Sequence, residues 1–460
     1  MKKIYIHCEI TKREFEGKLL LSILAANNNF EVYLGNISGL ESKIDLPSGI
    51  FHHTSCVPAK FILDLFKRLK KRNFVISCQD EEGGVEEVKE FFTKLPKGNF
   101  YYRFGEKSLK LVNAIFSWSN FDYDNLIARF PKFKNKIFNT GNPRVDMWSQ
   151  NLKDAYKDES LSKKYILISS NVSGPANNKT MMDDFKAIHR AYFEDKDLEF
   201  EKNKSFYFEQ HSAKTRYMNV FLSTVINLTK RFKNQKFIFR PHPTENLELW
   251  KFLFRKCKNI VVTKENSSTY WMHKSKILIQ NGCYTSIEAS NLGLDIVTYI
   301  PKEIKKYAKP FTASLGFNCL NQKQLFDTMK NILNKQNKKN IKTKKLKNFN
   351  KVNSRFHFPS KILNSQKIVE VWLDQIKENK IKNNYFNEIY FQIFIFFKKI
   401  NFILFKKIKI DEKVILDRKF EDINYNKTNL MTRKLIKILG LNPKIKFELI
   451  DNHICRIVKR

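Results

Sequence analysis

The chain has few of the features that mark secreted, zinc-stabilised or membrane-spanning proteins. Its seven cysteines are odd in number and scattered, without a C-x-x-C pair, which disfavours a disulfide framework and a structural zinc site. Glu9, Lys12 and Arg13 interrupt the apolar N-terminus too early for a signal peptide. No uninterrupted apolar run reaches the roughly 20 residues that a spanning helix needs. We therefore expect a cytoplasmic protein that begins with a β-strand.

Two nucleotide-binding signatures are also missing. The sequence contains no G-x-x-x-x-G-K-[ST], which excludes a P-loop NTPase. It has no G-x-G-x-x-G after the first predicted strand, which argues against a dinucleotide-dependent oxidoreductase.

Acidic residues are scarce relative to basic ones: 84 Lys and Arg against 46 Asp and Glu give a net charge of +38. Such an excess calls for an anionic partner, either a nucleic acid or an anionic membrane surface. Part of it reflects a general bias toward Lys, Asn, Ile and Phe. Because the sequence has no RNP-type aromatic strand or helix-turn-helix pattern, a non-enzymatic nucleic-acid-binding protein is kept only as a third alternative.

Short apolar runs alternate with helical patterns, and 460 residues exceed what one hydrophobic core supports. This pattern predicts an α/β fold with two Rossmann-like domains facing a cleft, plus a basic helical C-terminal region. The predicted strands are Ile4–His7, Phe30–Leu34, Gly49–His53, Phe74–Cys78, Ala114–Trp118, Lys136–Asn139, Tyr165–Ser170, Lys236–Arg240, Asn259–Val262, Ile277–Gln280 and Ile296–Ile300.

A polar stretch at 150–163 marks the boundary between the first two predicted domains. The first domain is 1–155. The second, 160–330, carries a mostly helical insert at 178–234. The third region is 331–460.

The third region is rich in lysine and aromatic residues. Residues 331–350 contain seven lysines and no acid, and 385–410 interleave Phe and Ile with lysine. Such a segment is typical of an interfacial anchor on an anionic membrane surface. The alternative is an ordinary core helix.

Three stretches carry side chains suited to chemistry. In the first, Arg240-Pro241-His242-Pro243, proline on each side fixes the histidine at the carboxyl end of a predicted strand, where ligands bind in open α/β sheets. A plain surface turn is the alternative.

In the second stretch, Asp80, Glu81 and Glu82 precede Gly83 at another strand end. Crowded carboxylates raise one another's pKa, which suits a general base near neutral pH. A solvated acidic loop is the alternative.

In the third stretch, Thr285, Ser286 and Glu288 begin a predicted helix after the strand Ile277–Gln280. Hydroxyl groups and unpaired amides there suit a phosphate. Ordinary helix capping explains the same residues.

The ordered set of these motifs resembles bacterial GT-B glycosyltransferases of the sialyltransferase and Kdo-transferase type, which use CMP-activated sugars. More broadly it resembles capsule and lipopolysaccharide biosynthesis proteins. The resemblance covers residues 1 to 320 and rests on Arg13-Glu14, Gln79-Asp80-Glu81-Glu82-Gly83, Thr140-Gly141-Asn142-Pro143-Arg144, Arg240-Pro241-His242-Pro243 and Thr285-Ser286.

The resemblance implies a GT-B-like arrangement in which domain 1–155 binds the acceptor and domain 160–330 binds the nucleotide sugar. It also implies that Glu81 or Glu82 is the base, that His242 meets the donor phosphate, and that Thr285 and Ser286 bind it. Asp80 is an additional acid that the family pattern lacks, so the identity of the base stays open. The expected substrate-binding residues are Arg13, Glu14, Gly83, Asn142, Arg144, Arg240, Pro243, Thr285, Ser286 and Glu288.

The expected protein is thus a peripheral enzyme on the inner face of the cytoplasmic membrane that moves a sugar from a nucleotide donor to a glycan or lipid-linked acceptor. No cofactor or metal is expected, because backbone amides and His242 suffice for a monophosphate leaving group. The alternative enzyme is a CDP-glycerol-type glycerophosphotransferase, which needs a second histidine; His7, His52, His53 and His211 are the candidates.

Overall fold

The computed structural model describes residues 2–85, 87, 103–157, 165–172, 174–177, 183, 186, 197–336, 338–359, 361–379, 381, 385–405 and 420–460. They form two compact units, which we call the first unit (2–84, 103–157 and 355–460) and the second unit (165–354). Three predicted features lie wholly or largely outside the described residues: the end of the polar boundary (158–163), the start of the helical insert (178–196) and the lysines at 406, 407 and 409.

The first unit is built on an eight-stranded sheet. Across the sheet the strands are β13 (Ile445–Asp451), β14 (Ile454–Lys459), β2 (Phe30–Gly35), β1 (Lys2–His7), β3 (Gly49–His53), β4 (Val75–Cys78), β5 (Ala114–Phe116) and β6 (Ile137–Phe138). Strands β1 to β6 are mutually parallel. Strands β2, β3 and β4 are buried along their whole length, as expected for a parallel sheet covered on both faces.

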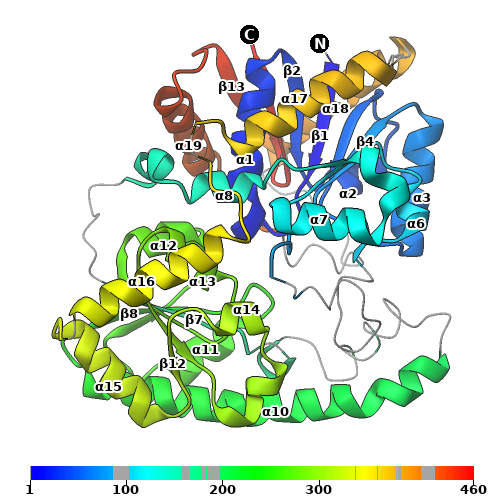
Figure 1. Ribbon diagram of the computed structural model, residues 1–460. Helices are drawn as coiled ribbons and strands as arrows, with labels where there is room; N and C mark the ends of the chain where they lie inside the picture. Colours follow the sequence, from blue (N-terminus) through cyan, green and yellow to red (C-terminus); the bar gives the residue numbers. More distant parts are fainter. Residues whose placement is uncertain are drawn as a thin grey trace. The chain divides into compact units, whose positions relative to one another are not determined.

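Helices cover this sheet and connect its strands (Figure 1). They are α1 (Thr11–Asn27), α2 (Ile37–Glu41), α3 (Lys60–Lys71), α6 (Glu106–Leu109), α7 (Asn120–Arg129), α8 (Pro143–Met147), α17 (Asn364–Asn379), α18 (Tyr385–Phe405) and α19 (Tyr425–Ile438), with the 3-10 helices η1 (Pro131–Lys136) and η2 (Gln150–Tyr156).

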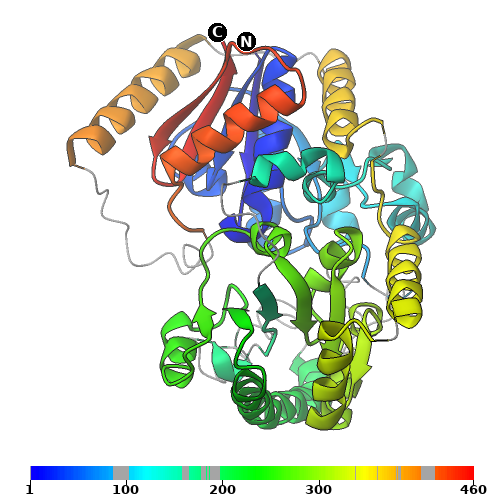
Figure 2. The same ribbon diagram turned by 90° about the vertical axis from the view of Figure 1, so that its left-hand side faces the viewer.

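The C-terminal residues complete the first sheet, which corrects the expectation of a separate helical region at 331–460. Strand β14 pairs antiparallel with β2, and β13 pairs antiparallel with β14. Figure 2 shows these strands (red) beside the N-terminal ones (blue). Without β14, the buried strand β2 would be an open edge, with unpaired backbone groups on one side.

Helix α17 ties the same region into the core. The indole nitrogen of Trp372 donates to Ser77 Oγ at 3.0 Å, and its ring packs edge-on against His52. At the start of α17, Asp146 accepts hydrogen bonds from the backbone amides of Asn364 and Ser365. The helix is therefore held at its N-terminus and along its buried face.

The second unit has a six-stranded, wholly parallel sheet. Its strands in spatial order are β12 (Phe317–Cys319), β11 (Asp295–Tyr299), β10 (Ser275–Gln280), β7 (Tyr165–Ser169), β8 (Lys236–Arg240) and β9 (Ile260–Val262). Numbered along the chain, this is the 3-2-1-4-5-6 order of dinucleotide-binding folds, which reverses between β7 and β10.

Successive residues of these strands enter two separate hydrophobic clusters. Ile166 and Ile168 belong to one cluster and Leu167 to the other, and β10 alternates in the same way. Both faces are therefore buried. The covering helices are α10 (Asp197–Arg231), α11 (Leu247–Leu253), α12 (Ser268–His273), α13 (Thr285–Asn291), α14 (Pro310–Ala313), α15 (Gln322–Leu333) and α16 (Lys338–Asn353), with η3 (Gly174–Ala176) and η4 (Lys302–Tyr307).

We expect Trp372→Ala to destabilise the first unit by about 3–5 kcal/mol, because it empties a fully buried site and removes a hydrogen bond. Phe386→Ala, at an exposed position of α18, should change stability by less than about 0.5 kcal/mol. Urea unfolding, with amide exchange of β3 and β4 as the local readout, measures both. Equal stability of the two variants would mean that the packing of α17 does not stabilise the first unit.

Candidate functional site

The predicted residues of the first unit gather at one edge of its sheet. Strands β1 and β4 are parallel, so helix α1 begins at the same edge at which the acidic loop 80–84 follows β4. Ion pairs and hydrogen bonds join the residues there into what we call the carboxylate cluster: Arg13, Glu14, Lys18, Asp80, Glu81, Glu82, Arg103 and Arg144.

Lys18 lies at the centre of this cluster. Its ammonium group is 2.8 Å from Glu14 and 3.1 Å from Glu81, and all three side chains are buried. Burial alone would lower the pKa of Lys18, but the two carboxylates together raise it. Burial would likewise raise the pKa of Glu14, but Lys18 and Arg13 lower it. The sequence analysis missed Lys18; the signal was a lysine one turn after Glu14 within the apolar run of α1.

Arg144 approaches the acidic loop from α8. Its guanidinium donates to the backbone carbonyl of Glu81 at 3.0 Å and stacks over the rings of Trp118 and Trp148. Asn142 caps α8 by accepting from the amide of Arg144 at 2.8 Å. Asn142 is therefore a local support for the arginine.

Asp80 and Glu82 share a cation that the sequence analysis did not single out. Arg103 hydrogen-bonds both carboxylates, and Arg13 lies 3.3 Å from Glu82. Burial is the main reason that the pKa of Asp80 is raised, and Arg103 partly opposes the shift.

The glycines of the acidic loop fit closely against the segment after β5. A Cβ on Gly83 would lie 2.1 Å from the ring of Trp118, so no other residue fits without movement. The amide of Gly84, whose φ is +80°, donates to Asp122 at 3.1 Å. Burial raises the pKa of Asp122 to about 7. Asp122 was also missed; it follows the strand next to β4, in Trp118-Ser119-Asn120-Phe121-Asp122.

The second unit positions His242 at the carboxyl end of β8, as the flanking prolines predicted. Thr244 lies beside the ring: its backbone amide donates to Nδ1 at 3.3 Å, and its hydroxyl is 2.8 Å away. Because an amide can only donate, Nδ1 acts as the acceptor, and a neutral ring carries its proton on Nε2.

The loop after His242 is anchored to the loop after β7. Glu245 accepts from the amide of Val172 at 2.8 Å and from the indole of Trp250 at 2.9 Å. Arg240 donates to the carbonyl of Glu265, and Lys264 donates to the carbonyl of Pro243. The turn is therefore rigid, and its carbonyl groups are used internally.

Thr285, Ser286 and Glu288 lie on α13, after β10. Strands β8 and β10 flank β7, so their ends are about 10 Å apart. The hydroxyl of Ser286 is buried and donates to the carbonyl of Cys283 at 2.8 Å. The capping alternative is wrong for this helix, because its N-cap is Tyr284 and no side chain caps it. Glu288 is buried and accepts from Ser268 at 2.9 Å. Thr285 is only partly buried as a residue, but its hydroxyl oxygen is buried.

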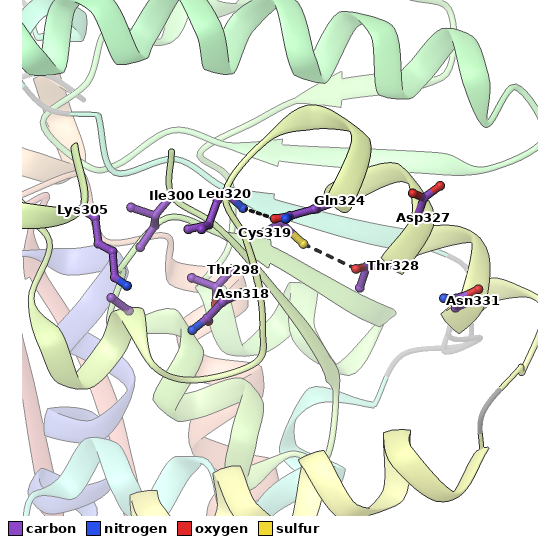
Figure 3. Close-up of a pocket in the computed structure, with 11 residues that line it drawn as sticks. Thr298, Ile300, Lys305, Asn318, Cys319, Leu320, Gln324, Asp327, Thr328 and Asn331 are labelled. Carbon is purple, nitrogen blue, oxygen red and sulfur yellow. Dashed lines mark hydrogen bonds between the residues drawn. The ribbon is translucent and has the colours of Figure 1, made fainter. Parts of the chain in front are cut away.

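A cavity of about 410 Å³ opens beside the ends of β11 and β12. Figure 3 shows Lys305, Asn318 and Gln324 among the side chains around it. Its volume lies within the range of small-molecule sites, but its lining includes none of the predicted site residues.

Nothing in the described part of the chain groups three or more His, Cys, Asp or Glu side chains in a way that could hold a metal ion. That the protein needs no metal or cofactor stays a prediction.

No family model and no curated protein sequence matches this chain. Similar solved structures include a variant of the wall teichoic acid polymerase TagF, 11% identical, covering 82% of this chain and 89% of that one at a TM-score of 0.50. A TagF variant soaked with CDPG is 13% identical over 82% and 89%, with a TM-score of 0.49. The UDP-GlcNAc 2-epimerase of Methanocaldococcus jannaschii is 15% identical over 81% and 100%, with a TM-score of 0.45.

At these identities the likeness concerns the fold. The chain has the α/β fold of two Rossmann-like domains seen in GT-B proteins, which confirms this part of the predicted fold class.

We expect Asp122→Asn to flatten the pH dependence of stability. Burial raises the pKa of Asp122 to about 7, above its ordinary value of 3.8, so the folded state holds the proton more tightly and loses stability as pH rises between these values. The asparagine cannot ionise but still accepts from Gly84. As the pH rises from 4 to 8, the free energy of unfolding of Asp122→Asn should increase relative to that of the wild type by on the order of 1–4 kcal/mol.

Urea unfolding at several pH values measures this difference. Asp64→Asn, at an exposed ion pair on α3, serves as the control and should leave the profile unchanged. Parallel profiles of Asp122→Asn and wild type would show that Asp122 ionises normally in the folded protein.

Proposed function

We propose that this protein is a glycosyltransferase that moves a sugar from a nucleotide donor, CMP-activated, to a glycan or lipid-linked acceptor of the cell surface. The observation that carries the proposal is the position of His242, on a rigid turn at the carboxyl edge of a parallel sheet with 3-2-1-4-5-6 strand order. In such sheets, ligands bind outside the carboxyl ends of the strands, where the order reverses.

The donor would bind to the second unit. With Nδ1 held as an acceptor by Thr244, the Nε2 proton of His242 is suited to a phosphate oxygen. Thr285 follows β10, on the other side of β7, and its hydroxyl group, which is buried in the structure, is the second group that we assign to this phosphate. A departing CMP carries one phosphate, which these donors would neutralise without a metal ion.

The acceptor would bind to the first unit, beside the carboxylate cluster. Glu81 is paired with Lys18, and Glu82 with Arg13 and Arg103, which suits carboxylates that orient substrate hydroxyl groups and cations. Asp80 is buried, and its raised pKa brings proton acceptance closer to neutral pH. We therefore assign the base to this acidic triplet, with Asp80 the candidate favoured by its environment. Arg13, Glu14, Gly83 and Arg144 would shape the site.

One observation favours the glycerophosphotransferase alternative. His211 on α10 lies 3.5 Å from the position that a Cβ of Gly174 would occupy. The same loop reaches Thr244, because the Asn177 side chain is 3.1 Å from its hydroxyl group. Two histidines of the second unit thus border one loop, whereas His7, His52 and His53 lie on strands of the first unit. The fold is also that of a teichoic acid polymerase. The two reactions can be distinguished by their products: glycosyl transfer forms a glycosidic bond, and glycerophosphate transfer forms a phosphodiester.

We expect His242→Ala to lower turnover by on the order of 10²-fold while the protein stays folded, because a donor to the leaving phosphate is lost. Release of nucleotide from a CMP-sugar, with and without acceptor, measures the rate. His453→Ala, on the turn between β13 and β14, is the control and should retain wild-type turnover. Full activity of a folded His242→Ala variant would show that His242 has no catalytic role and only forms part of the turn.

A further inference from the structure

Helix α18 has apolar side chains on two opposite faces. It is 21 residues long, or about 30 Å. Glu388, Phe391, Ile395 and Lys398 recur at intervals of three and four residues and face the first unit. Within the described residues, no helix has both the length and the apolar content to cross a bilayer.

The inner face is fixed on the first unit. The ring of Phe391 packs edge-on against Tyr33 with 5.2 Å between centroids, and against Tyr5. Ion pairs bind Glu388 to Lys3 and Lys398 to Asp451. Figure 2 shows α18 (orange) alongside the C-terminal strands. These contacts set which side of the helix faces outward.

The outer face is a continuous apolar stripe. Ile393, Phe397 and Leu404 are 48%, 57% and 67% exposed. Their spacing of four and seven residues places them on one side of the helix. The neighbouring exposed side chains are also apolar or aromatic, except for Asn401 between Phe397 and Leu404: Phe386, Ile389, Tyr390, Phe396 and Ile403. A patch of this kind, on the described surface, marks an interaction site.

We propose that the outer face of α18 inserts into the interfacial region of an anionic lipid membrane and that the helix lies parallel to the membrane plane. The proposal is independent of the glycosyltransferase assignment. Aromatic and branched apolar side chains on one face, with cations nearby, are the features by which a helix binds at the boundary of headgroups and acyl chains.

The charge around the helix identifies this partner. Residues 380–410 contain seven lysines, at 380, 382, 398, 399, 406, 407 and 409, and one acid, Glu388. Five of the lysines precede or follow the helix in the sequence. Each lysine near an anionic surface contributes about 1 kcal/mol of attraction. A second copy of this chain fits less well, because a two-fold interface would bring two lysine-rich segments together.

Co-sedimentation of the full-length protein with vesicles of phosphatidylcholine, with and without phosphatidylglycerol, tests the proposal. The wild type should bind the vesicles that contain phosphatidylglycerol and bind neutral vesicles less. The combined variant Ile393→Gln, Phe397→Gln, Leu404→Gln should bind on the order of tenfold less, because its inserted apolar surface is reduced. High salt should weaken wild-type binding only in part, since the apolar component is not screened.

The matched control replaces three exposed apolar residues of other helices: Phe61→Gln, Leu346→Gln, Leu430→Gln. It should bind vesicles as the wild type does, and both variants should keep the wild-type unfolding temperature. Equal binding by the α18 variant and the wild type would overturn the proposal. The proposal would also be overturned if light scattering showed that the wild type is a dimer and the α18 variant a monomer, and if the wild type did not bind vesicles.

Discussion

The buried ammonium group of Lys18 is the interaction on which the first unit's site depends. It neutralises Glu14 on its own helix and Glu81 on the loop after β4, and it donates to the carbonyl of His7 at the end of β1. One cation thereby joins α1, β1 and the acidic loop. Removing it would leave only Arg13 beside Glu14 and only Arg144, at 3.7 Å, beside Glu81. Breaking a buried ion pair by removing one partner typically costs about 3–5 kcal/mol. The remaining arginines of the carboxylate cluster extend this neutralisation toward Asp80 and Glu82.

The second unit fixes its candidate group by backbone rigidity. Prolines flank His242, Thr244 sets the acceptor role of Nδ1, and Glu245 anchors the turn to the loop after β7. The chain thus has acids held by cations in one Rossmann-like unit and an oriented imidazole in the other. A reaction that takes a proton from an acceptor and stabilises a leaving phosphate uses both kinds of group, as the proposed glycosyl transfer from a nucleotide would.

Sequence predicted much of the fold because buried parallel strands are short apolar runs: β3 and β8 have the predicted limits. Strands β13 and β14 were missed, since their partner β2 lies more than 400 residues away and no local pattern indicates the pairing. Motifs located the acidic loop and Arg144. They did not locate Lys18 or Asp122, because a lysine within a helix and an aspartate in the first turn of a helix are ordinary residues at those positions. The internal hydrogen bond of Ser286 likewise could not be predicted, because a serine at the start of a helix can cap it, bind a phosphate or donate to a nearby carbonyl, and only the structure shows the last.

Nucleotide binding by the second unit is the central claim, and thermal unfolding of the wild type and His242→Ala with CMP, CDP, UDP or GDP tests it most directly. A ligand that binds the folded state at about 100 times its Kd adds roughly 2.7 kcal/mol of stability. The account predicts that CMP raises the wild-type Tm by several degrees and raises that of His242→Ala much less. No shift with any nucleotide, or equal shifts in the two proteins, would contradict it.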